Sequence, residues 1–314
     1  MPDPRIDAIR NSLATHIHGK PHAIDSVITC LIAGGHILIE DVPGVGKTTL
    51  AYALSRAVNC EFNRIQFTSD LIPSDIIGVS VYHKPEARFV FHPGPIFANV
   101  VLADEINRSS PKSQSALLEA MERGLVTVDG ESYPIERPFI VIATQNPVDF
   151  ESTFPLPNAQ LDRFLMSISM GYPDSQAEKA MLRTGALHYD DINIKPAIEK
   201  QDIEALQILA RDIFIEDSTY DYIHEIVAKT RSHPAIEVGV SPRGALAFKT
   251  AIQAAALVDG RDFVTPSDIQ RLAKPCFAHR LKLRERHGFD LDWNAAGDLV
   301  DEILATIPQP HQTD

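Results

Sequence analysis

The chain has 314 residues and a mass of 34.6 kDa, which is enough for two packed domains or for one large domain with a lid. Its net charge of −13 and pI near 5.3 argue against general affinity for nucleic acid, because neutralising phosphates requires clustered Lys and Arg. The sequence has no apolar stretch of membrane-spanning length and no signal-peptide core, and its three cysteines are far apart. These features predict a cytoplasmic protein in a reducing compartment.

The first part of the chain alternates between helical and strand patterns. Apolar residues between 24 and 32 recur with a helical period and precede two glycines, so we expect a helix there. The apolar run 36–40 then predicts a short strand, and a helical pattern follows over 47–59. A second strand is expected over 63–68. A glycine-rich segment therefore lies between a strand and a helix.

The middle of the chain continues this alternation and adds two hairpins. Residues 69–97 are rich in Pro, Gly and β-branched residues, which predicts a loop, a short helix and a hairpin. We then expect a buried strand over 99–105 and a helix with a Ser cap and a Gly end over 110–124. A hairpin that turns at Asp129-Gly130 should follow over 125–136, and a second buried strand over 138–146. Strands that alternate with helices in this way predict a mostly parallel sheet in an α/β fold.

The character of the sequence changes after Tyr172-Pro173. Helical periodicity then dominates, most clearly over 241–260 and 265–281, and strand-like runs are few. We therefore predict an α/β core over residues 1–175 and a smaller all-helical lid domain over residues 190–314.

A possible phosphate-binding loop follows the first predicted strand. Residues 40–50 read EDVPGVGKTTL, and their end matches the pattern G-x-x-x-x-G-K-[ST]. That pattern begins with a glycine where this chain has Asp41, and a single loop match carries a real risk of coincidence. The segment is thus either a nucleotide site with one substitution or a glycine-rich turn.

Polar residues end two of the predicted buried strands. Asp104 would lie at the carboxyl edge of the sheet, where it can hold Mg²⁺ through water, and Glu105 beside it can orient an attacking water. Asn146 ends another strand and can bridge a γ-phosphate and the water. Taken alone, the two acids could be solvated strand-end residues, and Asn146 could be a turn residue before a proline.

Two arginines are candidates for phosphate contact. Arg163 follows a short helical segment, and Arg243 lies in the first turn of a helix after a Ser cap and a Pro. A cation at a helix N-terminus opposes the helix dipole, so Arg243 suggests an anionic ligand nearby. The alternative for either residue is an ordinary surface ion pair, which is the fate of most arginines.

Six segments of the chain are informative together. They read EDVPGVGKT, FTSDLIPSDIIG, FHPGPIFANVVLADEINRSSPKSQSALLEAMERG, IATQNP, FPLPNAQLDRF and SPRG. In combination they resemble one family, the MoxR family of AAA+ ATPases in the helix-2-insert group. The resemblance covers roughly residues 10–285, and its motifs are specific in combination. Sequences of this family resemble LEDVPGVGKT at the loop, so Asp41 is the residue that the resemblance leads us to expect there.

The resemblance implies a site for ATP and Mg²⁺. Lys47 is expected to contact the β- and γ-phosphates, while Thr48 and Asp104 hold Mg²⁺. The segment from Ile17 to Lys20, with Gly19, resembles the part that packs on adenine in related proteins. The residues expected to surround the phosphates are Asp41, Pro43, Gly44, Val45, Gly46, Lys47, Thr48 and Thr49.

The resemblance also assigns roles in hydrolysis. Glu105 corresponds to the residue that activates water, Asn146 to the first sensor and Arg243 to the second sensor, which reaches from the lid. Arg163 corresponds to the arginine finger that acts on a neighbouring subunit's nucleotide. Three further arginines could instead face a neighbour, namely Arg108, Arg123 and Arg137.

The resemblance further implies an oligomeric, chaperone-like machine that remodels or activates client proteins. We expect a ring, with six subunits as the expected number, and a partner that carries a von Willebrand A domain. The hairpins over 78–94 and 125–136 would project toward the central pore, or they could be purely structural. Two other functions stay open: an ATP-gated binding switch, and a DNA-dependent motor, against which the net charge of −13 counts.

Overall fold

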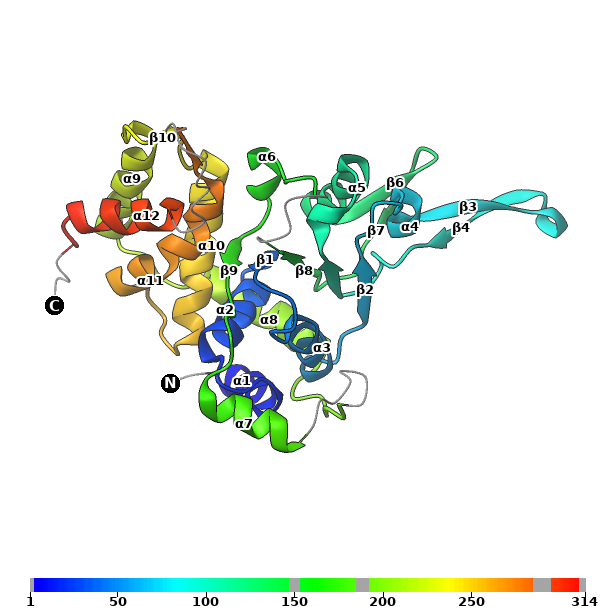
Figure 1. Ribbon diagram of the computed structural model, residues 1–314, viewed down its shortest axis with the longest axis horizontal. Coiled ribbons are helices and arrows are strands. Elements are labelled where there is room, and N and C mark those ends of the chain that lie inside the picture. Colours follow the sequence, from blue (N-terminus) through cyan, green and yellow to red (C-terminus); the bar gives the residue numbers. More distant parts are fainter. Residues whose placement is uncertain (1–2, 147–152, 185–191, 285–294, 311–314) are drawn as a thin grey trace.

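The structure, a computed structural model, describes residues 3–146, 153–184, 192–284 and 295–310. A parallel sheet with helices on both faces forms the core, and a mainly helical lid packs beside it (Figure 1). No helix in the described ranges is long and apolar enough to cross a membrane. The predicted α/β core with a helical lid is confirmed.

The central sheet has the strand order β2-β5-β8-β1-β9, and every neighbouring pair is parallel. Parallel pairing aligns the carboxyl ends of the strands, so that Gln66 pairs with Asp104 and Glu40 with Gln145. Candidate site residues that follow different strands are thereby brought to one edge. The strands are β1 (Ile37–Glu40), β2 (Phe62–Gln66), β5 (Val100–Asp104), β8 (Ile140–Gln145) and β9 (Met166–Ile168).

Alternate side chains of the inner strands point into two separate apolar clusters. In β1, Ile37 and Ile39 join one cluster, whereas Leu38 joins the other. The first cluster lies under α1 (Pro4–His16), α2 (Pro21–Ile32) and α3 (Lys47–Ala57), and the second under α4 (Pro73–Ile77) and α5 (Pro111–Arg123). Because both faces are covered, the strands read as continuous apolar runs.

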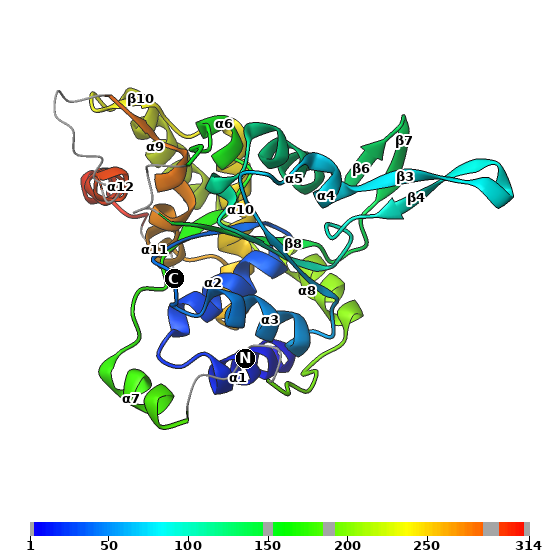
Figure 2. The ribbon, with the colours of Figure 1, turned by 45° about the vertical axis from the view of Figure 1, so that its right-hand side comes forward.

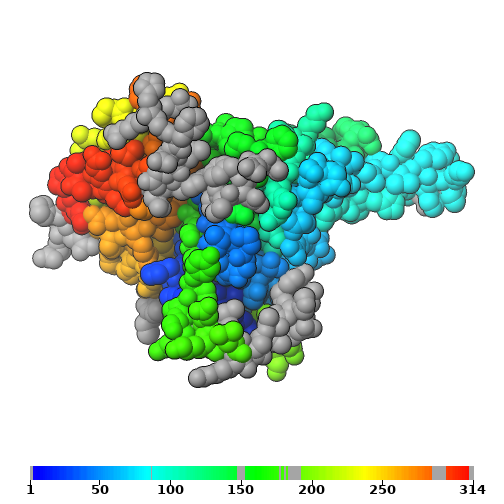
Figure 3. Space-filling model, in the orientation of Figure 1, coloured from blue at the N-terminus to red at the C-terminus, as the bar shows by residue number. Residues whose placement is uncertain are grey.

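The two predicted hairpins are confirmed. The longer one, β3 (Gly78–His83) with β4 (Arg88–Pro93), extends away from the body of the molecule (Figures 1, 2 and 3). The shorter one, β6 (Leu125–Val128) with β7 (Glu131–Pro134), turns at Asp129 and Gly130, with φ values of 51° and 85°. The Phe91 and Tyr133 rings stack with centroids 4.0 Å apart and join the two hairpins.

The second half of the chain is mainly helical. A short antiparallel pair, β10 (Ile236–Val238) with β11 (Lys282–Leu283), lies among its helices. Those helices are α6 (Asn158–Leu161) and α7 (Ser175–Thr184), which precede the lid, followed by α8 (Lys200–Arg211), α9 (Asp217–Ser232), α10 (Pro242–Val258), α11 (Pro266–Phe277) and α12 (Ala295–Thr306). As predicted, Ser110 and Ser241 cap α5 and α10.

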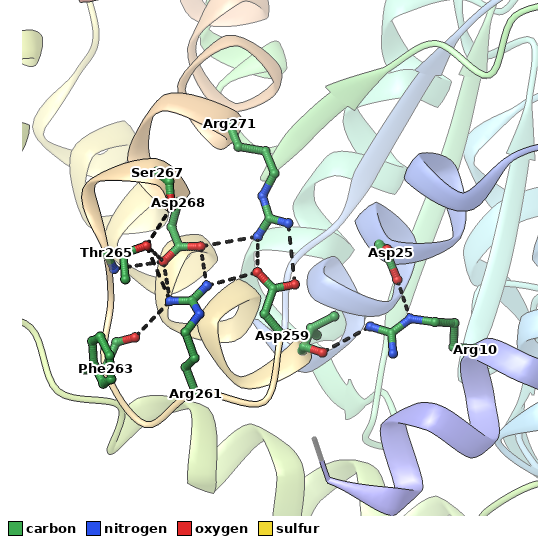
Figure 4. Close-up of polar contacts among 10 residues, drawn as sticks. Arg10, Asp25, Asp259, Arg261, Phe263, Thr265, Ser267, Asp268 and Arg271 are labelled. Carbon is green, nitrogen blue, oxygen red and sulfur yellow. Dashed lines mark hydrogen bonds and ion pairs between the residues drawn. The ribbon is translucent and has the colours of Figure 1, made fainter. Parts of the chain in front are cut away.

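Core and lid are joined by apolar packing and by specific hydrogen bonds. The cluster under α1–α3 continues into α8, α10 and α11 without a break. Arg10 of α1 donates to the carbonyl oxygen of Val258 at the end of α10, at 3.0 Å. The turn beyond Val258 is itself fixed by charged groups, because Arg261 forms two hydrogen bonds with the buried carboxylate of Asp268 (Figure 4).

A buried histidine ties the sheet to α5. The Nδ1 atom of His36 accepts from the Val141 N–H at 2.9 Å, so the proton lies on Nε2, which donates to the Met121 carbonyl at 3.1 Å. Burial lowers the pKa of His36 to about 4. The neutral ring therefore holds β1, β8 and the last turn of α5 in register.

Because His36 is buried in its neutral form, we predict that the folded protein loses stability in mild acid. Below about pH 6.5 the unfolded chain binds a proton at residue 36, whereas the folded chain does so only near pH 4. The free energy of unfolding should therefore fall between about pH 6.5 and 4, by at most about 1.4 kcal/mol per pH unit from this group. Urea unfolding at several pH values would measure the slope. A His36→Gln variant should show a shallower slope, and equal slopes would contradict this account.

Candidate functional site

The loop between β1 and α3 has the backbone shape of an anion-binding turn. Gly44 and Gly46 have φ values of 84° and 95°, which most residues with side chains avoid. A Cβ atom on either glycine would meet no atom within 4 Å, so backbone conformation rather than crowding requires glycine here. Gly46 is also the N-cap of α3, and as a glycine it has no side chain that could cap that helix. Its first N–H groups therefore suit a phosphate.

Lys47 lies at the start of α3 among acidic groups. Its Nζ atom donates to the Asp41 carbonyl oxygen at 2.8 Å. Burial lowers the pKa of Lys47, and the charges of Asp104, Asp41 and Glu105 offset part of this effect. The loop lysine and the two strand-end acids therefore lie within electrostatic range of one another.

Asp41 uses its carboxylate to anchor the loop. Oδ2 accepts from the Met170 N–H at 2.7 Å, the Gly171 N–H at 2.6 Å and the Ser169 hydroxyl at 3.0 Å. Oδ1 accepts from the Val42 N–H at 2.9 Å. A glycine at position 41 could make none of these contacts. The aspartate thus fixes the loop to the segment that leads from β9 toward the lid.

Asp104 ends β5 at the carboxyl edge of the sheet, as predicted. Its Oδ1 atom accepts from the Thr144 hydroxyl at 2.6 Å, and its Oδ2 atom pairs with Arg64 at 2.7 Å. The same Thr144 hydroxyl accepts from the Glu105 N–H at 2.9 Å. One threonine of β8 therefore positions both acids.

Glu105 has a left-handed backbone, with φ 55° and ψ 50°. This conformation is unfavourable for a residue with a side chain, and it persists because Thr144 holds the N–H. Its Oε2 atom accepts from Gln66 at 3.2 Å and from Arg108 at 2.9 Å. The carboxylate is thus held beside Asp104 by groups from β2 and from the turn after β5.

Asn146 directly follows β8, which lies between β1 and β5 in the sheet. Its carbonyl oxygen accepts from Asn107 at 3.5 Å. The strand order therefore places Asn146 between the loop after β1 and the acids after β5.

Arg163 and Arg243 come together, and both bind Glu122 of α5. The Arg163 Nε atom lies 2.8 Å from one carboxylate oxygen, and an Arg243 Nη atom lies 3.2 Å from the other. In the described ranges, neither side chain forms a hydrogen bond or ion pair with the loop 41–48. The structure thus divides the predicted residues into a loop-and-acid group and an arginine pair.

The segment predicted to pack on adenine lies between α1 and α2. Ile17 is buried, and Gly19 has a φ of 69°. Lys20 donates to the carbonyl oxygens of Met170 at 2.7 Å and Gly171 at 2.9 Å, and also to that of Tyr172. Asp41 and Lys20 therefore bind the N–H and carbonyl groups of the same connecting segment.

The remaining predicted residues belong to the loop and to the first turn of α3. Val45 is buried, Pro43 is exposed, and Thr48 and Thr49 are partly exposed. A threonine hydroxyl and a carboxylate are oxygen ligands of the kind that Mg²⁺ prefers, so Thr48 and Asp104 fit this ion. The open glycine turn and Lys47 fit the phosphates of a nucleotide.

Sequence reasoning missed the residues that position the site. Thr144 was visible as a lone hydroxyl in an apolar strand, two residues before Asn146. Gln66 and Arg64 alternate along β2 and reach the acids only through the pairing of β2 with β5. Glu122 carried no local signal, because it lies among other charges at the end of a helix.

A glycine at position 41 would restore the general loop pattern, yet we expect it to destabilise the protein. Asp41→Gly leaves three N–H groups and a hydroxyl without their acceptor, which should cost about 2 kcal/mol or more. Urea unfolding would measure the loss. Asp70→Gly, in an exposed loop, is the matched control and should lose far less. Equal losses would show that the glycine backbone, not the lost carboxylate, causes the change.

Comparison with known proteins covers both parts of the chain. Residues 36–166 match the model of the "ATPase family associated with various cellular activities (AAA)", and residues 228–303 match that of the "AAA lid domain". The chain is 49% identical to the uncharacterized protein YeaC of Bacillus subtilis, over 91% of its own length and 88% of the relative's. It is 39% identical to Chaperone MoxR1 of Mycobacterium tuberculosis, over 94% and 79% of the two chains.

A solved structure agrees with these relatives. It is a crystal structure from Cytophaga hutchinsonii, of a protein whose assignment as an ATPase is provisional. Its TM-score is 0.86 at 34% identity, and the match covers 98% of this chain and 95% of that one. Because the similarity runs through core and lid alike and extends over most of each relative, the chain belongs to the MoxR family of AAA+ ATPases.

Proposed function

We propose that this protein hydrolyses ATP with Mg²⁺ and uses the energy to remodel or activate client proteins. The observation that carries the proposal is the meeting of Lys47, Asp104 and Glu105 at one sheet edge, with Thr144 holding both acids. Family membership supports ATPase activity in general. The name of the relative Chaperone MoxR1 supports the chaperone-like part of the proposal.

Each residue has a role that follows from its place. The N–H groups of the loop and Lys47 would bind the phosphates, and Thr48 with Asp104 would hold Mg²⁺, which supplies charge neutralisation. Glu105 would orient and polarise the attacking water, and Gln66 and Arg108 keep its carboxylate in position. Asn146 would bridge this water and the terminal phosphate.

The arginine pair supports a site that is completed between subunits. Arg163 and Arg243 bind Glu122, and within the described ranges neither side chain forms a hydrogen bond or ion pair with the loop 41–48, which favours a role for both at another copy's nucleotide. We therefore propose a ring, with six subunits as the expected number, in the cytoplasm. The extended β3–β4 hairpin would face its pore. We also propose a partner with a von Willebrand A domain, an α/β core over residues 1–175 and a lid domain over residues 190–314.

Two variants separate binding from hydrolysis. Lys47→Ala should lose ATP binding in a titration, because the phosphates lose their only loop cation. Glu105→Gln should still bind ATP but hydrolyse it at least about a hundredfold more slowly, because water loses its base. Lys112→Ala, on the exposed face of α5, is the control for loss of a lysine and should behave as wild type.

Client activity of Glu105→Gln decides between enzyme and switch. A remodelling enzyme would lose that activity together with turnover, whereas a variant that still supports the client would favour the ATP-gated switch. Full hydrolysis by Lys47→Ala would contradict the assignment of the loop.

A further inference from the structure

One carboxylate holds the two candidate phosphate-contacting arginines. Glu122 lies in the last turn of α5; its Oε2 atom accepts from Arg163 Nε at 2.8 Å and its Oε1 atom from Arg243 Nη1 at 3.2 Å. The bond from Arg163, with the charge of Arg243, holds the pKa of Glu122 below its usual value. A shared anion offsets the repulsion between two guanidinium groups that core and lid bring together.

A hydrogen bond also joins the chain segment beside Arg163 to the segment beside Arg243. Asp162, which precedes Arg163, accepts from the Ser241 hydroxyl at 3.0 Å and from Arg280 Nε at 2.8 Å. Ser241, two residues before Arg243, is the N-cap of α10. The same core–lid junction therefore sets the positions from which both arginine side chains extend.

The contacts with Glu122 leave the phosphate-binding edges of the arginines in place. Arg163 uses Nε, and within the described ranges its side chain has no other hydrogen bond or ion pair, so its two Nη groups can bind a phosphate side by side. Arg243 uses one Nη group and is 49% exposed at its side chain. Glu122 therefore orients both groups without covering them.

We propose that Glu122 is a positioning residue that makes Arg163 and Arg243 one phosphate receptor, acting together on the nucleotide of a second copy of this chain. This inference rests on the proposed ATPase function. Without Glu122, the two arginines would be held less precisely. ATP would then bind as before, but the transition state of hydrolysis would be stabilised less. It also predicts that the two arginines act at the same nucleotide.

Steady-state ATP hydrolysis by Glu122→Ala tests the proposal. We expect kcat to fall by about tenfold to a hundredfold, with KM changed by no more than about twofold. The control is Glu119→Ala, one turn earlier on α5, whose exposed ion pair with Arg123 spans 3.4 Å. It should keep both constants, because it removes the same charge from the same helix without touching either arginine.

A mutant cycle distinguishes positioning from a merely structural role. If Glu122 acts through the arginines, Glu122→Ala should have no further effect on kcat in a protein that already carries Arg163→Ala and Arg243→Ala. A further loss in that background, an unchanged kcat in the single variant, or a raised kcat would each overturn the proposal. Absence of turnover in the wild-type protein would instead overturn the proposed function, so the two failures are distinguishable.

Discussion

The parallel register of the central sheet is the constraint on which the site depends. Residues that are far apart in the chain meet because their strands end at one edge, with β8 between β1 and β5. Burial on both faces fixes this register, since a shift by one residue would exchange the two apolar clusters. Thr144 of β8 then positions the two acids at the end of β5, because its hydroxyl group hydrogen-bonds to both Asp104 and Glu105.

A second constraint couples the loop to the lid. Asp41 holds the N–H groups of residues 170 and 171, and Lys20 holds the carbonyl oxygens of the same residues. The chain leaves the core through this segment. The loop after β1 and the segment 170–171 are therefore tied to each other, and the hydrogen bond of Ser241 to Asp162 ties the lid to the core beside the arginine pair.

The sequence predicted most of the fold, and with it the sheet edge at which the candidate site lies. Strands with continuous apolar runs, the Ser caps of α5 and α10 and the Asp129-Gly130 turn carry local signals, and the structure confirms them. Two side chains that hold site residues, Gln66 and Glu122, carry no local signal. Gln66 reaches Glu105 only because β2 pairs with β5, and Glu122 meets two arginines only because core and lid pack together.

Asp41 departs from the general sequence pattern of phosphate-binding loops for a structural reason. The general loop pattern expects glycine there, but the carboxylate binds three N–H groups and a hydroxyl that glycine could not. The family resemblance led us to expect Asp41 at this position. The contacts that its carboxylate makes became visible only in the folded structure. The role proposed for Arg163 involves a second copy of the chain, so it depends on assembly as well as on the fold.

The most direct test of a site completed between subunits is a mixing experiment. Arg163→Ala subunits keep an intact loop, and Lys47→Ala subunits keep intact arginines, so each preparation alone should have little ATPase activity. If hydrolysis joins the loop of one copy to the arginine of another, the mixture should be clearly more active than the sum of its parts. A mixture whose activity equals that sum, under conditions where the two variants assemble together, would contradict the account.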